Sequence, residues 1–160
     1  MKKRIYSLLF ALSCVVMVMA QKTSVYAYSQ NTVECLGTEL DGSQTVRVSG
    51  IGRTRADSRE QCKKNAVWAV LFKGIRGGIG DCNMKPIITE ANAEEKYEEY
   101  FNIFFMDGGE YLKYVSMEDT KKYSQKKAKS KTHANYTYTV RVMRPQLKQR
   151  LTEDGVIKAN

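Results

Sequence analysis

Six lysines between Lys121 and Lys131 form the densest run of one charge in the chain, and no acidic residue falls among them. Such a run attracts anions, among them glycolipid head groups, polysaccharides and nucleic acid. Charge runs are more often solvated loops that keep a protein dispersed, and this second interpretation is the favoured one. The candidate anion-binding residues are Lys121, Lys122, Lys126, Lys127, Lys129 and Lys131.

Residue types that support catalysis are sparse. His133 is the single histidine, and it adjoins the lysine run. Glu94, Glu95, Glu98 and Glu99 cluster at helical spacing, which is typical of a solvated helix face. Acid–base catalysis by two of them requires one to be buried with a raised pKa. No metal-binding spacing such as C-x-x-C or H-E-x-x-H occurs. We therefore expect a protein that is not an enzyme and that holds no metal.

Two glycine-rich segments, Gly50–Gly52 and Gly74–Gly80, do not fit phosphate-binding loops. Arg55 stands where a dinucleotide-binding loop requires its third glycine. Ile79 stands where a Walker loop requires its second glycine, and no Lys-Ser/Thr pair follows. We expect no nucleotide cofactor, and we interpret Gly74–Gly80 as a helix stop followed by a loop.

The first 20 residues are typical of an export signal. Three cations at positions 2–4 precede a short apolar segment, Ile5–Met19, and Ala20 suits a cleavage site. The segment is shorter than a membrane-spanning helix, which needs about 20 apolar residues. Cys14 resembles a lipidation site, but Ala11 replaces the usual leucine three residues upstream. We favour soluble export without a lipid, to the periplasm or the outer membrane of a bacterium.

Removal of residues 1–20 lowers the count of basic residues from 26 to 23, against 17 acidic ones. About 140 residues remain, which is the size of one domain. We expect a loosely ordered lead-in over residues 21–43, a single domain over 44–155 and a tail over 156–160.

Three cysteines remain after the signal, Cys35, Cys62 and Cys82. In an oxidising compartment they form at most one disulfide and leave one thiol free. The chain turns back through the glycine-rich loop, which favours a Cys62–Cys82 pair. Cys62 also suits a buried apolar residue on a helix face, and both interpretations stay open.

The periodicity of apolar residues predicts one strand followed by one long helix. Thr45–Ile51 alternates in polarity, as a half-buried strand does. Asp57 or Ser58 caps a helix that continues to Lys73, and Gly74 ends it. Small residues share one helix face and allow a close approach to the layer below, namely Cys62, Ala66, Ala69 and Val70.

The rest of the chain predicts further short elements. We expect a short acidic helix, two strands of a hairpin, a last strand and a final helix, at Thr89–Tyr97, Phe101–Met106, Glu110–Met117, Asn135–Met143 and Pro145–Gly155. The order β-α-α-β-β-β-α predicts an α+β fold with an antiparallel-dominated sheet of about four strands. One long helix packs on one face of that sheet.

The segment VRVSGIGRTRADSREQCKKNAVWAVLF resembles the start of exported domains in the LPP20 and flagellar-T-protein N-terminal group. Val46, Val48 and Gly50 match the strand pattern of that group, and Ala66 and Ala69 match its small-residue helix face. The resemblance implies an SHS2-like α+β domain in the cell envelope and brings no catalytic residues with it.

These patterns predict a non-catalytic envelope protein that binds another protein. The sheet face opposite the helix should be polar, with Arg47, Ser49, Thr137, Thr139 and Arg141, and an exposed edge strand would suit a partner strand. The alternative is a polyanion-binding domain that uses Lys121–Lys131 for a glycolipid or polysaccharide. Nucleic acid is not expected, because the run holds one aromatic residue, Tyr123, and no arginine.

Overall fold

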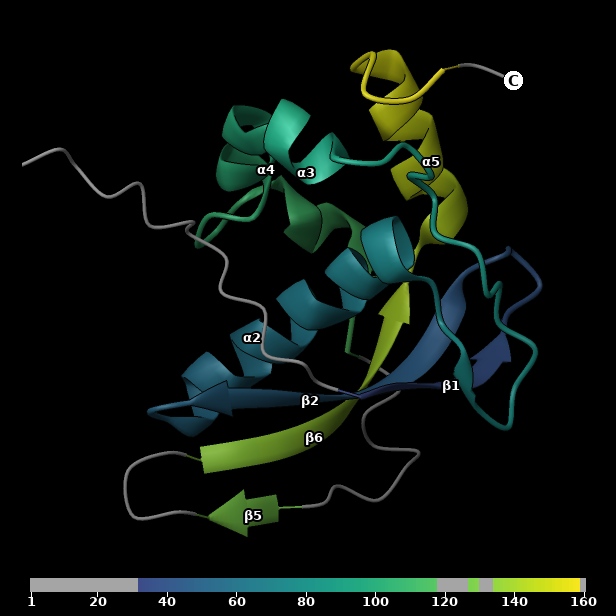
Figure 1. Cartoon of the computed structure of the whole chain (residues 1–160). Helices are drawn as coiled ribbons and strands as arrows, with labels where there is room; N and C mark the ends of the chain where they lie inside the picture. Colours follow the sequence, from purple (N-terminus) through teal and green to yellow (C-terminus); the bar gives the residue numbers. More distant parts are fainter. Residues whose placement is uncertain (1–31, 118–126, 130–133, 159–160) are drawn as a thin grey trace, which may run out of the picture.

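The computed structural model describes residues 32–117, 127–129 and 134–158. They form an α+β fold in which the helices gather on one face of a sheet (Figure 1). The sheet has six strands in the order β3-β1-β2-β6-β4, and β5 also pairs with β6. The α+β class and the one-sided helices agree with the sequence prediction, whereas the expected four strands are too few.

All strand pairs are antiparallel except β1 with β3, which are parallel. The strands are β1 (Val33–Thr38), β2 (Gln44–Gly52), β3 (Gly77–Gly78), β4 (Val115–Ser116), β5 (Lys127–Lys129) and β6 (Ala134–Val142). The helices are α2 (Arg55–Trp68), α3 (Ala93–Lys96), α4 (Glu98–Phe104) and α5 (Arg144–Glu153), with a π-helix η1 (Ala69–Lys73) and a 3-10 helix η2 (Glu110–Tyr114).

Strand β1 lies within the stretch that we expected to be a loosely ordered lead-in. It pairs with β2 and places Cys35, which is 1% exposed, opposite Val46 in the core. No other residue of β1 is fully buried, so its apolar pattern is weak in the sequence. The expected export signal, Cys14 and residues 21–31 lie outside the described residues.

Helix α2 begins one turn earlier than predicted. Thr54 is the N-cap, and Asp57 completes a capping box with it, so neither Asp57 nor Ser58 is the cap. The Ser58 hydroxyl instead donates to the carbonyl of Gly50 on β2. The helical segment continues through η1 to Lys73 and ends at Gly74 with φ of 73°, as the sequence predicts.

Helix α2 lies between the sheet and the shorter helices (Figure 1). Its small-residue face, with Cys62 and Ala66, packs toward the valines of β2 and β6. Aromatic rings from α4 and η2 and the leucines of α5 complete one core cluster. Its largest fully buried side chains include Tyr111, Phe101, Phe105, Leu71, Leu147 and Leu151.

The predicted hairpin at Phe101–Met106 and Glu110–Met117 is wrong. Phe101, Phe104 and Phe105 are the buried residues, and their three- and four-residue spacing is helical. Ile103, which a strand would bury beside Phe101, is 69% exposed. In the second half, Glu110–Tyr114 forms η2, and only the next two residues, Val115 and Ser116, pair as β4.

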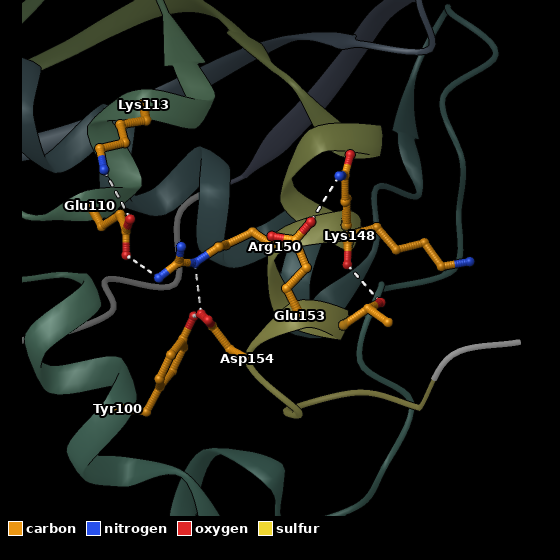
Figure 2. A network of polar contacts seen from close by, with 9 residues as sticks. Tyr100, Glu110, Lys113, Lys148, Arg150, Glu153 and Asp154 are labelled. Atoms are coloured by element: carbon orange, nitrogen blue, oxygen red, sulfur yellow. Dashed lines mark hydrogen bonds and ion pairs between the residues drawn. The ribbon is translucent and has the colours of Figure 1, made fainter.

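Helix α5 is attached to α4 and η2 by a polar network (Figure 2). The Arg150 guanidinium donates to Asp154 at 2.8 Å and to Glu110 at 3.2 Å. The Tyr100 hydroxyl donates to the same Asp154 carboxylate at 2.6 Å, and burial raises the pKa of that hydroxyl. Lys113 pairs with Glu110 at 3.0 Å, so one chain of contacts joins three elements.

Candidate binding surface

The predicted anion-binding lysines are described only in part. Lys127 and Lys129 belong to β5, whose backbone pairs with Tyr136 and Ala134 of β6. Lys121, Lys122, Lys126 and Lys131 lie outside the described residues, as does His133. The part of the lysine run that the structure describes is therefore an edge strand of the sheet.

The predicted Cys62–Cys82 disulfide is wrong, because Cys82 is bonded to Cys35 with a Cα–Cα distance of 5.8 Å. The glycine-rich loop does not turn back to α2. It crosses to β1, where Gly77 and Gly78 pair with Glu34 and Cys35. Of the three cysteines in the described part of the chain, Cys62 is the free thiol, and it is buried, as the alternative interpretation held.

Glycine is required where this loop meets β1. Gly78 has φ of +112°, and a side-chain carbon there would lie 2.2 Å from the Cys35 carbonyl oxygen. Ile79 then donates its amide to that same oxygen at 3.2 Å. The loop and the disulfide together cover the outer edge of β1.

The face of the sheet opposite the helices is polar, as the alternation of β2 and β6 predicts. The register places Thr45 beside Arg141, Arg47 beside Thr139 and Ser49 beside Thr137. None of the described helices covers this surface (Figure 1), and we call it the helix-free face. Its half-buried residues are Glu34, Glu39, Arg47, Ser49, Thr137 and Arg141, whereas Thr45 and Thr139 point the same way but are only 3% exposed.

Neighbouring side chains on the helix-free face are joined in pairs. Arg47 lies 3.4 Å from Glu34, and the hydroxyls of Ser49 and Thr137 are 2.9 Å apart. Glu39, at the end of β1, accepts from the Thr45 hydroxyl at 2.8 Å and lies 3.5 Å from Arg141. The four charged side chains retain 29% to 44% exposure. The face is thus polar and ordered, with its charges balanced.

The expected exposed edge strand is not found at β1 or along most of β6. The Gly77–Cys82 loop covers β1. On its outer edge, β6 pairs with β4 at one end and with β5 at the other. Both flanking strands are short, which is one way that proteins limit unwanted pairing. Tyr111, which precedes β4 in the chain, is fully buried, and Tyr114 is partly buried.

A cavity of about 270 Å³ lies between α2 and the turn after α4, and no residue pattern predicts it. It is lined by Asp57, Glu60, Gln61, Lys64, Asp107 and Gly108. Lys64 pairs with Asp107 at 2.7 Å, and this contact lowers the pKa of the Asp107 carboxyl. Apolar periodicity could not identify Lys64, because a lysine within a helix predicts a solvated position.

The carboxylates in this cavity already have partners. Glu60 pairs with Lys63 at 2.6 Å and accepts from the Tyr111 hydroxyl at 3.1 Å. Asp57 accepts from the Thr54 amide as part of the capping box. Burial raises the pKa of Tyr111, which keeps this hydroxyl protonated as a donor. The Lys64–Asp107 pair holds the turn against α2, and the Tyr111–Glu60 hydrogen bond does the same for η2.

The acidic cluster of α3 and α4 also makes structural contacts. Glu94 accepts from the Trp68 indole. Lys96, which lies between these glutamates in the sequence, pairs with Glu90 at 2.7 Å. Among the described residues, no group of three or more His, Cys, Asp or Glu side chains could hold a metal ion.

No helix within the described residues is long and apolar enough to cross a membrane. Comparison with protein-family models, with curated proteins and with solved structures finds no match to this chain. The resemblance to the LPP20 and flagellar-T-protein group stays a prediction from the residue pattern.

Proposed function

We propose that this chain is a non-catalytic, exported cell-envelope protein that binds another protein through its helix-free face. The observation that carries the proposal is the one-sided architecture: the helices pack on one face of the sheet and leave the other polar and ordered (Figure 1). A surface whose side chains already hold each other in place loses little freedom on binding, which favours affinity.

The pattern of charges on this face favours a protein partner. Its acidic and basic groups alternate as Glu34–Arg47 and Glu39–Arg141. Charges on such a surface select a partner that carries the complementary pattern, and they repel a protein that places like charges opposite them. A polyanion would instead require a surface of one sign.

Two features support export to the envelope. Residues 1–20 have the layout of an export signal. The Cys35–Cys82 disulfide suits an oxidising compartment, because disulfides are rare in reducing ones.

The test is affinity capture from envelope extract of the source organism, at low and at high salt. The exported protein is compared with an Arg47→Gln/Arg141→Gln variant and with a control variant, Lys73→Gln/Lys148→Gln. Both variants lose two charges, and the control residues are exposed on the helical side. We expect one stoichiometric protein that survives high salt, is lost with the face variant and is retained with the control. Equal capture by all three proteins would contradict the proposal.

The second candidate function is polyanion binding through Lys121–Lys131. The observation that favours it is β5, which attaches Lys127 and Lys129 to the edge of the sheet instead of leaving the whole run as a loop. Glycolipid or polysaccharide binding that weakens steeply with salt, and that is lost when the six lysines become glutamine, would support it. Binding that is insensitive to salt would exclude it.

A further inference from the structure

One side of α2 carries a stripe of polar residues that faces the turn after α4. Its members recur at the three- and four-residue steps of one helix side, namely Asp57, Glu60, Gln61 and Lys64. Ser58 and Cys62 lie on another side of the helix and contact β2. The cavity of about 270 Å³ between the stripe and the turn is therefore separate from the helix-free face, which lies on the other side of the sheet (Figure 1).

Lys64 is the most deeply buried charge of this stripe, since its side chain is only 9% exposed. An ammonium group carries three N–H donors. Among the described residues, the one acceptor of its hydrogen bonds is Asp107 Oδ1, at 2.7 Å. The Tyr111 ring centre lies 5.7 Å from Nζ, which attracts the cation but takes no second hydrogen bond. A buried donor without an acceptor is costly, so Lys64 favours an anionic group in the cavity.

Asp107 forms the open side of the cavity, because its side chain is 96% exposed. Its Oδ1 accepts from Lys64, whereas its Oδ2 accepts no hydrogen bond from the part of the chain that the structure describes. The cavity thus presents a buried cation and an exposed anion whose charged atoms are 2.7 Å apart. A ligand that reaches one of these groups also meets the other.

The charges around the cavity argue against a simple ion as the ligand. Three carboxylates and one ammonium line it, so they repel a ligand that carries negative charge alone. A divalent cation is also a poor fit, because no group of three or more His, Cys, Asp or Glu side chains in the described residues could hold a metal. An amine alone would pair with Asp107 but would leave Lys64 donors without an acceptor. A ligand that carries both charges avoids each of these costs.

We infer that the cavity binds a free α-amino acid, whose carboxylate accepts from Lys64 and whose ammonium donates to Asp107. In an α-amino acid both charged groups are attached to one carbon, so they can reach two protein charges that lie side by side. The four charges then alternate in sign, and each has an opposite charge as its neighbour. The inference is independent of the proposed function, because the cavity and the helix-free face share no residue.

The size of the cavity favours a free amino acid over a peptide. Ligand pockets usually have volumes of about 300–1,000 Å³, and this cavity is at the small end of that range. A peptide also presents only one of the two charges at each end, a carboxylate at the C-terminus or an ammonium at the N-terminus. Only the free amino acid carries both charges on one carbon.

The first test is calorimetric titration of the exported protein with each of the common amino acids at millimolar concentration. The amino acid that binds most tightly is then compared with its N-acetyl derivative and with its amide. The first derivative keeps only the carboxylate, as a peptide C-terminus does, and the second keeps only the ammonium, as an N-terminus does. Each should bind about tenfold or more weakly, because a hydrogen bond to a charged group is worth at least that factor.

The second test changes the two charges of the protein. Lys64→Gln and Asp107→Asn should each weaken binding of the amino acid by about tenfold or more. The control is Glu90→Gln/Lys96→Gln, which removes another lysine–carboxylate pair with the same 2.7 Å separation from an exposed position, and its affinity should equal that of the wild type. Thermal unfolding confirms that each variant is folded. If Lys64→Gln does not fold, Asp107→Asn, which changes an exposed side chain, carries the test alone.

Three outcomes would overturn the inference. No binding of any amino acid would show that the cavity holds only solvent. Equal binding of the N-acetyl derivative or of the amide would assign the cavity to a peptide end or to a ligand with a single charge. Full affinity in Asp107→Asn and Lys64→Gln, or an equal loss in the control, would place the amino acid elsewhere on the protein.

Discussion

The thiol of Cys62 is enclosed where α2 crosses the sheet. Its Sγ lies 3.4 Å from the Val48 carbonyl oxygen and 3.5 Å from that of Tyr136. Burial raises the pKa of this thiol to about 12. Since the thiolate is the reactive form, Cys62 should be inert in the folded protein.

This leads to a labelling prediction. In the folded exported protein, which lacks residues 1–20 and so Cys14, iodoacetamide at pH 8 should leave Cys62 unmodified. In denaturant without reductant it should add one label per chain. Mass spectrometry counts the labels, and Cys62→Ala provides the unlabelled control. Rapid labelling of the folded protein would show that α2 does not cover this thiol.

The raised pKa also predicts how stability depends on pH. The ordinary thiol pKa is 9.0, and in the folded state it is about 12, so the folded protein retains a proton that the unfolded chain loses above pH 9. The stabilisation is fully present below pH 9 and is lost as pH rises toward 12. At pH 10 the wild type should lose about 1 kcal/mol of unfolding free energy that Cys62→Ala does not lose. Denaturant titration of both proteins measures this difference.

At the scale of elements, the contact of α2 with β2 depends on Gly50. A side-chain carbon there would lie 2.3 Å from the Ser58 carbonyl oxygen and 2.7 Å from the Cys62 Sγ. Gly50→Ala should therefore lower the unfolding free energy by roughly 1–3 kcal/mol through overpacking. Gly37→Ala is the matched control, because nothing lies within 4 Å of its added carbon. Similar stability of the two variants would contradict the close packing of α2 on β2.

The attachment of α5 to α4 and η2 should depend on the contacts of Arg150 (Figure 2). Arg150→Gln breaks the ion pairs with Asp154 and Glu110. Because its side chain is 37% exposed, the expected loss of unfolding free energy is small. Hydrogen exchange should accelerate in residues 144–153. Lys148→Gln, an exposed change on the same helix, should leave exchange unaltered. Unchanged exchange in both variants would mean that packing of Leu147 and Leu151 alone holds α5.

The sequence predicted the elements whose buried residues follow a single period. The alternation in β2 and β6 and the small-residue face of α2 each fit only one interpretation. Residues Phe101–Met106 fit both a strand and a helix, and the helix buries Phe104 against the rings of Phe105 and Tyr114. β1 contributes one fully buried residue, which is too little to signal a strand.

For the whole molecule, the Cys35–Cys82 disulfide joins the loop after η1 to the edge of the sheet. It closes a segment with a sequence separation of 47 residues, for which chain-entropy estimates give about 4 kcal/mol. Cys35→Ala/Cys82→Ala should lower the unfolding free energy by an amount of that order, as should reduction of the wild type. Denaturant titration with and without reductant measures it. A variant as stable as the wild type would show that the loop holds to β1 without the bond.

The candidate surfaces were predictable to the extent that they depend on alternation. In β2 and β6 every second side chain points to the same face of the sheet, so the polar residues of the helix-free face could be named in advance. The disulfide and the cavity at Lys64 join segments that are distant in the chain. Local periodicity carries no information about such contacts; for example, nothing in the sequence places Asp107 against Lys64.

The most direct test of the proposed function is the affinity of the captured partner for the purified protein, measured by calorimetry at high salt. Arg47→Gln/Arg141→Gln should bind at least tenfold more weakly than the wild type, because it removes both cations of the helix-free face. Lys73→Gln/Lys148→Gln should bind as the wild type does. Full affinity in the face variant, or an equal loss in the control, would contradict the assignment of binding to the helix-free face.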